Sequence, residues 1–144
     1  MSETIEQICK KKGVKLTDQR KIIATVLSES KEVYGESDHP DVDELYQRVS
    51  KLDSKISIAT VYRTVKLFEE YGAIEKLEFK DGRSRYEAIE EAHHDHLIDI
   101  ETGEIHEFTN DEIETIQARV ASELGFKLVD HRLELYGVKK KNKN

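Results

Sequence analysis

Cysteine is almost absent from this sequence, and long apolar segments are missing. The single cysteine, Cys9, excludes an intrachain disulfide and a zinc site built from cysteines. Any metal site must therefore use nitrogen and oxygen ligands. No stretch of the sequence is apolar enough to span a bilayer, and residues 1–4 lack the basic and apolar regions of a signal peptide. These absences predict a cytoplasmic protein with no membrane partner.

Net positive charge is also lacking. The formal net charge of -7 argues against a DNA-binding protein, because phosphate neutralisation requires clustered lysine and arginine side chains. The first 25 residues differ from the rest, since six basic side chains against three acidic ones give them a local charge of +3. DNA binding through the N-terminal part of the chain therefore stays open.

The N-terminal part of the sequence contains a series of helix patterns followed by two strand patterns. Apolar spacing predicts helices over residues 3–12, 17–27, 41–52 and 57–71. Residues 30–38 are expected to form a polar loop. Two strand-like segments at 74–79 and 84–87 flank an Asp81-Gly82 turn, which predicts a β-hairpin. Helices followed by a hairpin predict a winged helix-turn-helix.

The predicted helix over residues 57–71 has two unlike faces. Its apolar side chains Val61, Val65 and Phe68 follow one side. The other side carries the polar side chains Thr60, Tyr62, Arg63 and Lys66. Because the apolar face is already filled, Tyr62 is expected at the surface, the alternative being a core aromatic. This polar face is the candidate DNA-reading surface.

The remaining third of the chain changes to short strands and one helix. Strands are predicted over residues 97–100, 104–108 and 126–138, with a helix between the last two that begins at a Thr109-x-x-Glu112 cap. Such a small half needs a partner copy or a metal for stability. The fold class is therefore α+β, with a winged helix-turn-helix over 1–88 and a small α/β dimerisation domain over 89–144, joined by a hinge near 85–93.

The densest chemical signal is His93-His94-Asp95-His96. Side chains alternate in an extended segment, so His94 and His96 project to one side, and His93 and Asp95 to the other. One segment then supplies two metal sites, with a solvated loop as the alternative. Further ligands are expected from His39, Glu87, Glu107, Glu114 and His131, although each alone also suits a plain surface position. Asp99, Glu101 and Glu104 look like solvated turn charges.

Several motifs, taken in order, resemble one known family. They are Lys15-x-Thr17-x-x-Arg20, Ala59-Thr60-Val61-Tyr62-Arg63, Gly82-x-x-x-Tyr86-Glu87, His93-His94-Asp95-His96-Leu97-Ile98, Ile105-x-Glu107-Phe108 and Leu133-x-Leu135-Tyr136-Gly137. The sequence resembles the ferric uptake regulator family over nearly its whole length, and most of all those alphaproteobacterial members that sense iron or manganese.

The resemblance implies a metal-dependent repressor of metal-uptake genes that works as a homodimer on AT-rich, pseudo-palindromic operators in double-stranded DNA. Its hinge sensor site would consist of His39, Glu87, His94, His96 and, in some members, Glu107. Its second site, in the dimerisation domain, would consist of His93, Asp95, Glu114 and His131. On DNA, Thr60, Tyr62 and Arg63 would face the major groove and Lys15 the minor groove. The effector would be Fe²⁺ or Mn²⁺, with Zn²⁺ possible.

Two positions depart from the family pattern. Many members carry a Cys-x-x-Cys that holds a structural zinc, but this chain has Asp99 and Thr102 there, so that zinc is not expected. The loop over residues 31–37 is also longer than is common, which leaves the placement of His39 open. Two alternatives remain at this point: a winged-helix regulator that responds to haem or peroxide, and a metal-dependent hydrolase.

Overall fold

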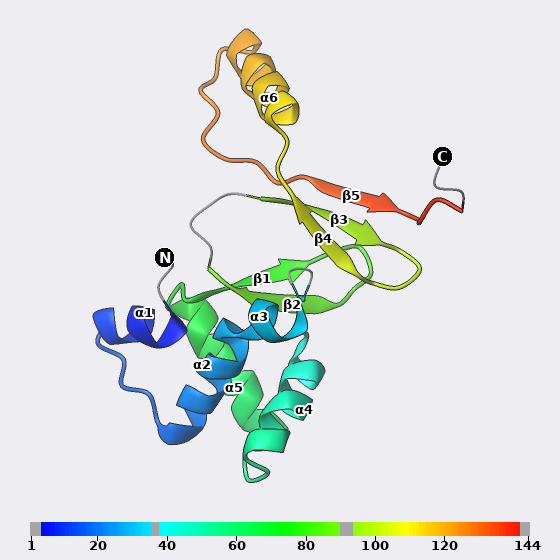
Figure 1. Ribbon diagram of the computed structural model, residues 1–144. Helices are drawn as coiled ribbons and strands as arrows, with labels where there is room; N and C mark the ends of the chain where they lie inside the picture. The colour runs from blue at the N-terminus through cyan, green and yellow to red at the C-terminus, as the bar shows by residue number, and fades with distance from the viewer. Residues whose placement is uncertain (1–3, 36–37, 90–93, 142–144) are drawn as a thin grey trace. The chain divides into compact units, whose positions relative to one another are not determined.

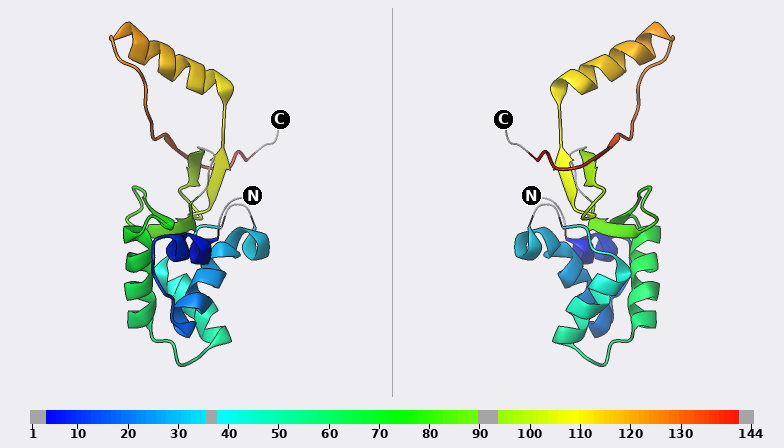
Figure 2. Two further views of the ribbon diagram at one scale, coloured as in Figure 1. Left: turned by 90° about the vertical axis from the view of Figure 1, so that its left-hand side faces the viewer. Right: turned by 90° about the vertical axis from the view of Figure 1, so that its right-hand side faces the viewer.

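The computed structural model describes residues 4–35, 38–89 and 94–141 (Figures 1 and 2). The chain divides into two compact units, Met1–Glu91 and Ala92–Asn144. The predicted ligand His93 and the end of the predicted hinge lie outside the described residues. Within the described ranges, every helix is too short or too polar to cross a membrane.

Five helices build the described part of the first unit, and side-chain caps fix where most of them begin. They are α1 (Ile5–Lys11), α2 (Asp18–Ser28), α3 (Ser30–Tyr34), α4 (Val42–Leu52) and α5 (Ile58–Glu70). Thr4, Thr17, Asp41 and Ser57 each accept a hydrogen bond from a backbone N–H in the first turn. At Asp41 the Glu44 side chain accepts from the Asp41 N–H in return, which confirms the predicted capping box.

The core of this unit lies where α1, α2, α4 and α5 meet. Its members are buried apolar side chains from every one of these helices, including Ile5, Cys9, Ile23, Leu27, Leu45, Val49, Val61, Val65 and Phe68. Burial raises the pKa of the Cys9 thiol, and the charge of Lys12 opposes this shift without cancelling it. Cys9 is therefore a core residue and not a reactive thiol.

Helix α3 occupies the segment that was predicted to be a polar loop, so that prediction was wrong. This helix buries only Ser30 and has no apolar face, which is why its sequence carries no helical periodicity. Contacts with α4 hold it instead. The Arg48 guanidinium lies over the Tyr34 ring, 3.6 Å from its centroid, and Arg48 also pairs with Asp38.

The wing follows α5 and matches the predicted hairpin. Strands β1 (Ile74–Glu78) and β2 (Ser84–Ala88) pair antiparallel, from Ile74 opposite Ala88 to Glu78 opposite Ser84. Gly82 has a φ of 78° in the turn between them, a conformation that favours glycine. Arg83 reaches from this turn to Asp41 and Glu44, at 2.7 and 2.9 Å, and so ties the wing to the start of α4.

The second unit is a three-stranded sheet with one helix. Its strands are β3 (Asp95–Asp99), β4 (Ile105–Phe108) and β5 (Glu134–Gly137), in the order β4-β3-β5, and its helix is α6 (Asp111–Glu123). Strand β3 pairs antiparallel with β4 and parallel with β5. The central strand is therefore the one that begins with the histidine-rich segment.

Two boundaries in this unit were predicted wrongly. The α6 cap is Asn110, whose side chain accepts from the Ile113 N–H, and not Thr109. Strand β5 is only Glu134–Gly137, which pairs with β3 from Glu134 opposite His96 to Gly137 opposite Asp99. Residues 126–133 are not part of a strand, although their apolar alternation resembles one. Within this segment the Leu133 carbonyl accepts from the N–H of His96 on β3.

Helix α6 buries none of its residues. In Figures 1 and 2 it extends away from the sheet of its own unit, and Ile116, Val120 and Leu124 are 48%, 47% and 71% exposed. Phe126, just after the helix, is 72% exposed. Apolar side chains gathered in this way on one surface are typical of an interface with another protein chain.

Candidate metal centres and DNA-contact surface

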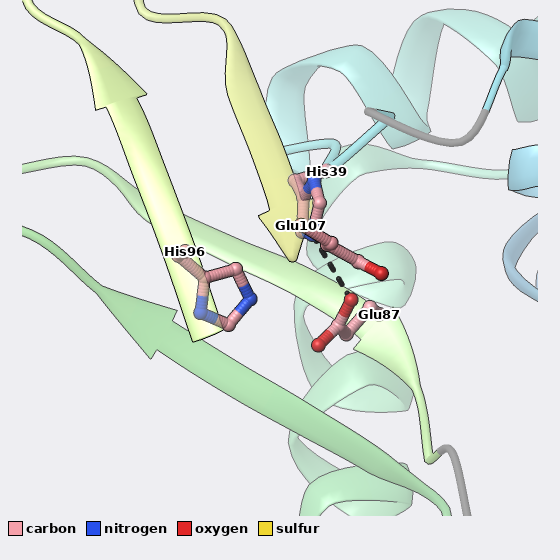
Figure 3. A group of neighbouring side chains, drawn as sticks. All are labelled: His39, Glu87, His96 and Glu107. Atoms are coloured by element: carbon pink, nitrogen blue, oxygen red, sulfur yellow. Dashed lines mark ion pairs between the residues drawn. The ribbon is translucent and has the colours of Figure 1, made fainter. Parts of the chain in front are cut away.

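In the first unit, His39 and Glu87 form a buried ion pair. His39 Nε2 lies 3.0 Å from Glu87 Oε2, and the side chains are 0% and 3% exposed (Figure 3). The Tyr86 N–H donates to the Pro40 carbonyl at 2.9 Å, so the segment that carries His39 runs beside β2. The placement of His39, which the sequence left open, is therefore against Glu87 beside β2.

Lys31, on α3, reaches the same carboxylate. Its Nζ atom lies 3.3 Å from Glu87 Oε2, the oxygen that also contacts His39. Sequence reasoning missed Lys31, because a lysine is not an expected metal ligand and its segment was expected to be a loop. No signal in the sequence pairs residue 31 with residue 87.

In the second unit, two histidines and one glutamate gather at the start of β3. His94 Nε2 lies 3.5 Å from Glu107 Oε1, and the His94 and His96 rings meet edge to face with centroids 4.8 Å apart. His96 lies directly opposite Glu107 on β4 (Figure 3). Two imidazoles and a carboxylate are a ligand set that suits Fe²⁺, Mn²⁺ and Zn²⁺.

A separate cluster in the second unit consists of Asp95, Glu114 and His131, whose ligand atoms all lie within 4.8 Å of one another. His131 Nε2 is 3.1 Å from Asp95 Oδ1 and 3.6 Å from Glu114 Oε1. The three residues come from β3, from the first turns of α6 and from the segment before β5. The side chains of the β3 segment thus alternate as expected, with Asp95 turned away from the cluster of His94 and His96.

The ligand atoms in these groups have spacings that a single metal ion can bridge. Two atoms that bind one ion at about 2.0–2.2 Å are separated by roughly 3.0–3.6 Å, depending on the angle at the metal. The His39–Glu87, His94–Glu107 and Asp95–His131 separations are 3.0, 3.5 and 3.1 Å. The residues present therefore fit divalent metal, and the donors are all nitrogen and oxygen.

The turn after β3, where the family pattern often has cysteines, is closed by hydrogen bonds. Asp99 Oδ1 accepts from the N–H groups of Glu101 and Thr102, at 2.9 and 3.3 Å, and Thr102 Oγ1 accepts from the Glu104 N–H. The Glu101 N–H is the main reason why the pKa of Asp99 is lowered. Asp99 is 4% exposed, so its description as a solvated turn charge was wrong.

The polar face of α5 lies at the surface, as expected. Tyr62 is 60% exposed and Arg63 is exposed, whereas Val61 and Val65 are buried. Thr60 is half-buried, and its N–H donates to the Ser57 hydroxyl at the start of the helix. Lys15 is exposed in the segment between α1 and α2. The polar side of the helix is thus available to a DNA groove, and Tyr62 is not a core aromatic.

A winged helix, followed by a small α/β unit with clustered imidazoles and carboxylates, defines a metal-responsive DNA-binding regulator. The chain belongs to the ferric uptake regulator family, whose model matches residues 11–136. It is 56% identical to the ferric uptake regulation protein of Rhizobium leguminosarum bv. viciae over 138 residues, which cover 96% of this chain and 93% of that protein.

Two solved structures show the same fold. A zinc-bound manganese uptake regulator is 56% identical to this chain, with a TM-score of 0.82, and the match covers 96% of this chain and 100% of that one. The Vibrio cholerae ferric uptake regulator is 35% identical, with a TM-score of 0.80, covering 93% and 98% of the two chains.

Family membership settles the general function. The chain is a metal-responsive transcription regulator of metal uptake, in a family whose members bind DNA operators as dimers. The family is one of regulators and not of enzymes, so the hydrolase alternative is set aside.

Proposed function

We propose that this chain is a repressor of metal-uptake genes, switched on for DNA binding by Fe²⁺ or Mn²⁺ at a hinge site. The proposed ligands are His39, Glu87, His94 and His96, together with Glu107. One observation carries the proposal: each unit holds its own histidine–glutamate pair, at 3.0 Å for His39–Glu87 and 3.5 Å for His94–Glu107. Both separations suit two ligands of one ion.

The switch follows from the division of the ligands between two units of the chain. An ion that takes ligands from both units stabilises one relative orientation of them over all others. In a homodimer that orientation sets the spacing of the two α5 helices, which must match DNA half-sites about 34–36 Å apart. Metal and DNA then strengthen each other's binding by linkage, typically by about 1–3 kcal/mol.

The ligand chemistry favours Fe²⁺ and Mn²⁺ for the switch. These ions accept five or six nitrogen and oxygen ligands, and none of the proposed ligands is a thiolate. Related structures are described with zinc, iron or manganese. Zn²⁺ suits the second site, for which we propose His93, Asp95, Glu114 and His131, because its nitrogen and oxygen ligands can form a tetrahedron. An ion there ties α6 to β3.

The DNA contacts are proposed from the exposed polar face of α5. Tyr62 and Arg63, with Thr60, face base edges in the major groove, where arginine recognises guanine and apolar atoms contact thymine methyl groups. Lys15 enters an adjacent minor groove, which is narrow and strongly negative in AT-rich sequence. The operators are therefore AT-rich pseudo-palindromes read by a homodimer in the cytoplasm, where the chromosome of a bacterial cell lies.

The test is a mobility shift on an AT-rich pseudo-palindrome, comparing metal-free protein with added Fe²⁺, Mn²⁺ or Zn²⁺. His96→Ala is expected to abolish metal-dependent binding, and the order of the metals in wild type ranks the effectors. The matched control is His106→Ala, since His106 lies on β4 outside both clusters and is exposed. Binding that ignores both metal and His96→Ala would remove the hinge site as the switch.

A further inference from the structure

Lys31 stands out because it places a fixed positive charge beside a proposed metal ligand. Its Nζ atom and His39 Nε2 approach the same Glu87 oxygen, at 3.3 and 3.0 Å. The Lys31 and Glu87 side chains are 19% and 3% exposed, so water screens their interaction much less than that of a surface pair. A divalent ion that binds this oxygen meets an ammonium group already beside it.

The position of Lys31 is set by contacts on the rest of α3. We name Ser30, Tyr34, Asp38 and Arg48 the α3 clamp. The Ser30 hydroxyl donates to Asp38, and Arg48 donates two hydrogen bonds to Asp38, at 2.7 and 2.8 Å. Arg48 also stacks on Tyr34. Because Asp38 immediately precedes His39, the α3 clamp holds both the lysine and the histidine at Glu87.

We propose that the Lys31 ammonium forms an ion pair with Glu87 when no metal is bound, and that metal binding displaces it. The inference rests on the proposed function, since it takes Glu87 as a ligand of the hinge site. The Lys31 ammonium repels a cation bound beside it, which opposes the metal-bound state. The Lys31–Glu87 ion pair, which metal binding breaks, stabilises the metal-free state. Both effects lower metal affinity, so Lys31 sets the metal concentration at which the regulator responds.

The first test measures Mn²⁺ affinity in the full-length chain carrying His131→Ala, which removes a ligand of the second cluster. Free Mn²⁺ is followed by its electron paramagnetic resonance signal during titration. In this background, Lys31→Met is expected to bind Mn²⁺ roughly tenfold more tightly, the scale on which groups around metal ligands act. Lys31→Arg keeps the charge and is expected to match the unmodified background.

The control for loss of charge is Lys51→Met, on the exposed side of α4, which is expected to leave Mn²⁺ affinity unchanged. Unchanged or weaker Mn²⁺ binding by Lys31→Met would overturn the inference. Glu87→Gln separates that failure from failure of the proposed function. If Glu87→Gln binds Mn²⁺ as tightly as its parent, Glu87 is not a ligand and the hinge site itself is wrong.

A second test needs no substitution. Reductive methylation of the wild-type protein, read by mass spectrometry, reports how accessible each lysine is with and without saturating Mn²⁺. Displacement predicts that Lys31 is modified faster when Mn²⁺ is present, while Lys51 keeps its rate. A Lys31 rate that does not rise with bound Mn²⁺ would show that the lysine stays on Glu87, which contradicts the proposal.

Discussion

The two units of this chain obtain their stability in different ways. In the first unit, four helices bury a continuous apolar core, and Phe68 and Val61 at its centre are 0% exposed. In the second, α6 buries nothing, and the buried side chains of β3 include Asp95, His96 and Asp99. The first unit is stabilised by apolar burial, which needs no partner. Under the proposed function, the second unit gains stability from a metal ion at its polar clusters and from a second copy over its exposed apolar side chains.

The largest expected effect is in the core of the first unit. Phe68→Ala removes a fully buried ring and is expected to lower the free energy of unfolding by about 3–5 kcal/mol. Chemical denaturation measures this loss of free energy, and hydrogen exchange of the α4 and α5 amides shows where it acts. Leu124→Ala, at the residue that ends α6, is the counterpart in the second unit, where 71% exposure predicts little loss within one chain. Equal losses at both positions would contradict the difference between the units.

Metal removal is expected to act mainly on the second unit. An ion at 100 times its dissociation constant stabilises the folded state by about 2.7 kcal/mol, and a chelator removes that contribution. Hydrogen exchange in β3 and β5 should therefore accelerate with chelator, while α5 amides keep their protection. In His131→Ala the response should shrink, since one of the three clustered ligands is gone. If the chelator accelerated hydrogen exchange equally in both units, the effect of the metal would not be local to the second unit.

The smallest expected effects come from two carboxylates, one in each unit. Partial burial opposes ionisation of Asp41, but the Glu44 N–H and the Arg83 guanidinium outweigh it and hold its pKa below the usual range. At Asp99 the Glu101 N–H lowers the pKa. A lowered pKa in the folded state means that each charge stabilises the protein above the ordinary carboxyl pKa. This stability is lost as the pH falls through the folded-state value.

Acid titration of the free energy of unfolding distinguishes the two carboxylates. Asp41→Asn should reduce the acid-dependent loss by less than about 1 kcal/mol, because the group is partly exposed to solvent. Asp99→Asn should reduce it too, with the change seen in β3 amides and not in α4. The comparison fails if Asp99→Asn alters the exchange of amides in the first unit and leaves the β3 amides unchanged.

Local signals carried most of the sequence prediction. The wing follows from an Asp-Gly turn between two strand patterns, and the split faces of α5 follow from helical spacing. Alternation along the histidine-rich segment correctly separated Asp95 from His94 and His96. Each of these inferences needs only residues that are close together in the chain.

The errors concern contacts made at a distance. Helix α3 is held by Arg48 from α4, and the bounds of β5 depend on its pairing with β3, a strand almost forty residues earlier in the chain. The approach of Lys31 to Glu87 joins residues from separate elements, and no spacing rule connects them. The burial of Asp99 was missed because a turn aspartate looks the same in sequence whether its side chain bonds neighbouring amides or faces water.

Strand β3 constrains how this family member can change over evolution. Its neighbouring residues serve opposite clusters, so the order of ligands depends on the period of two along the strand. Inserting one residue between His94 and His96 would turn His94 toward the cluster of Asp95 and leave a gap beside Glu107. Substitutions can therefore exchange these side chains one at a time, whereas a change in the length of this segment turns a side chain of one cluster toward the other.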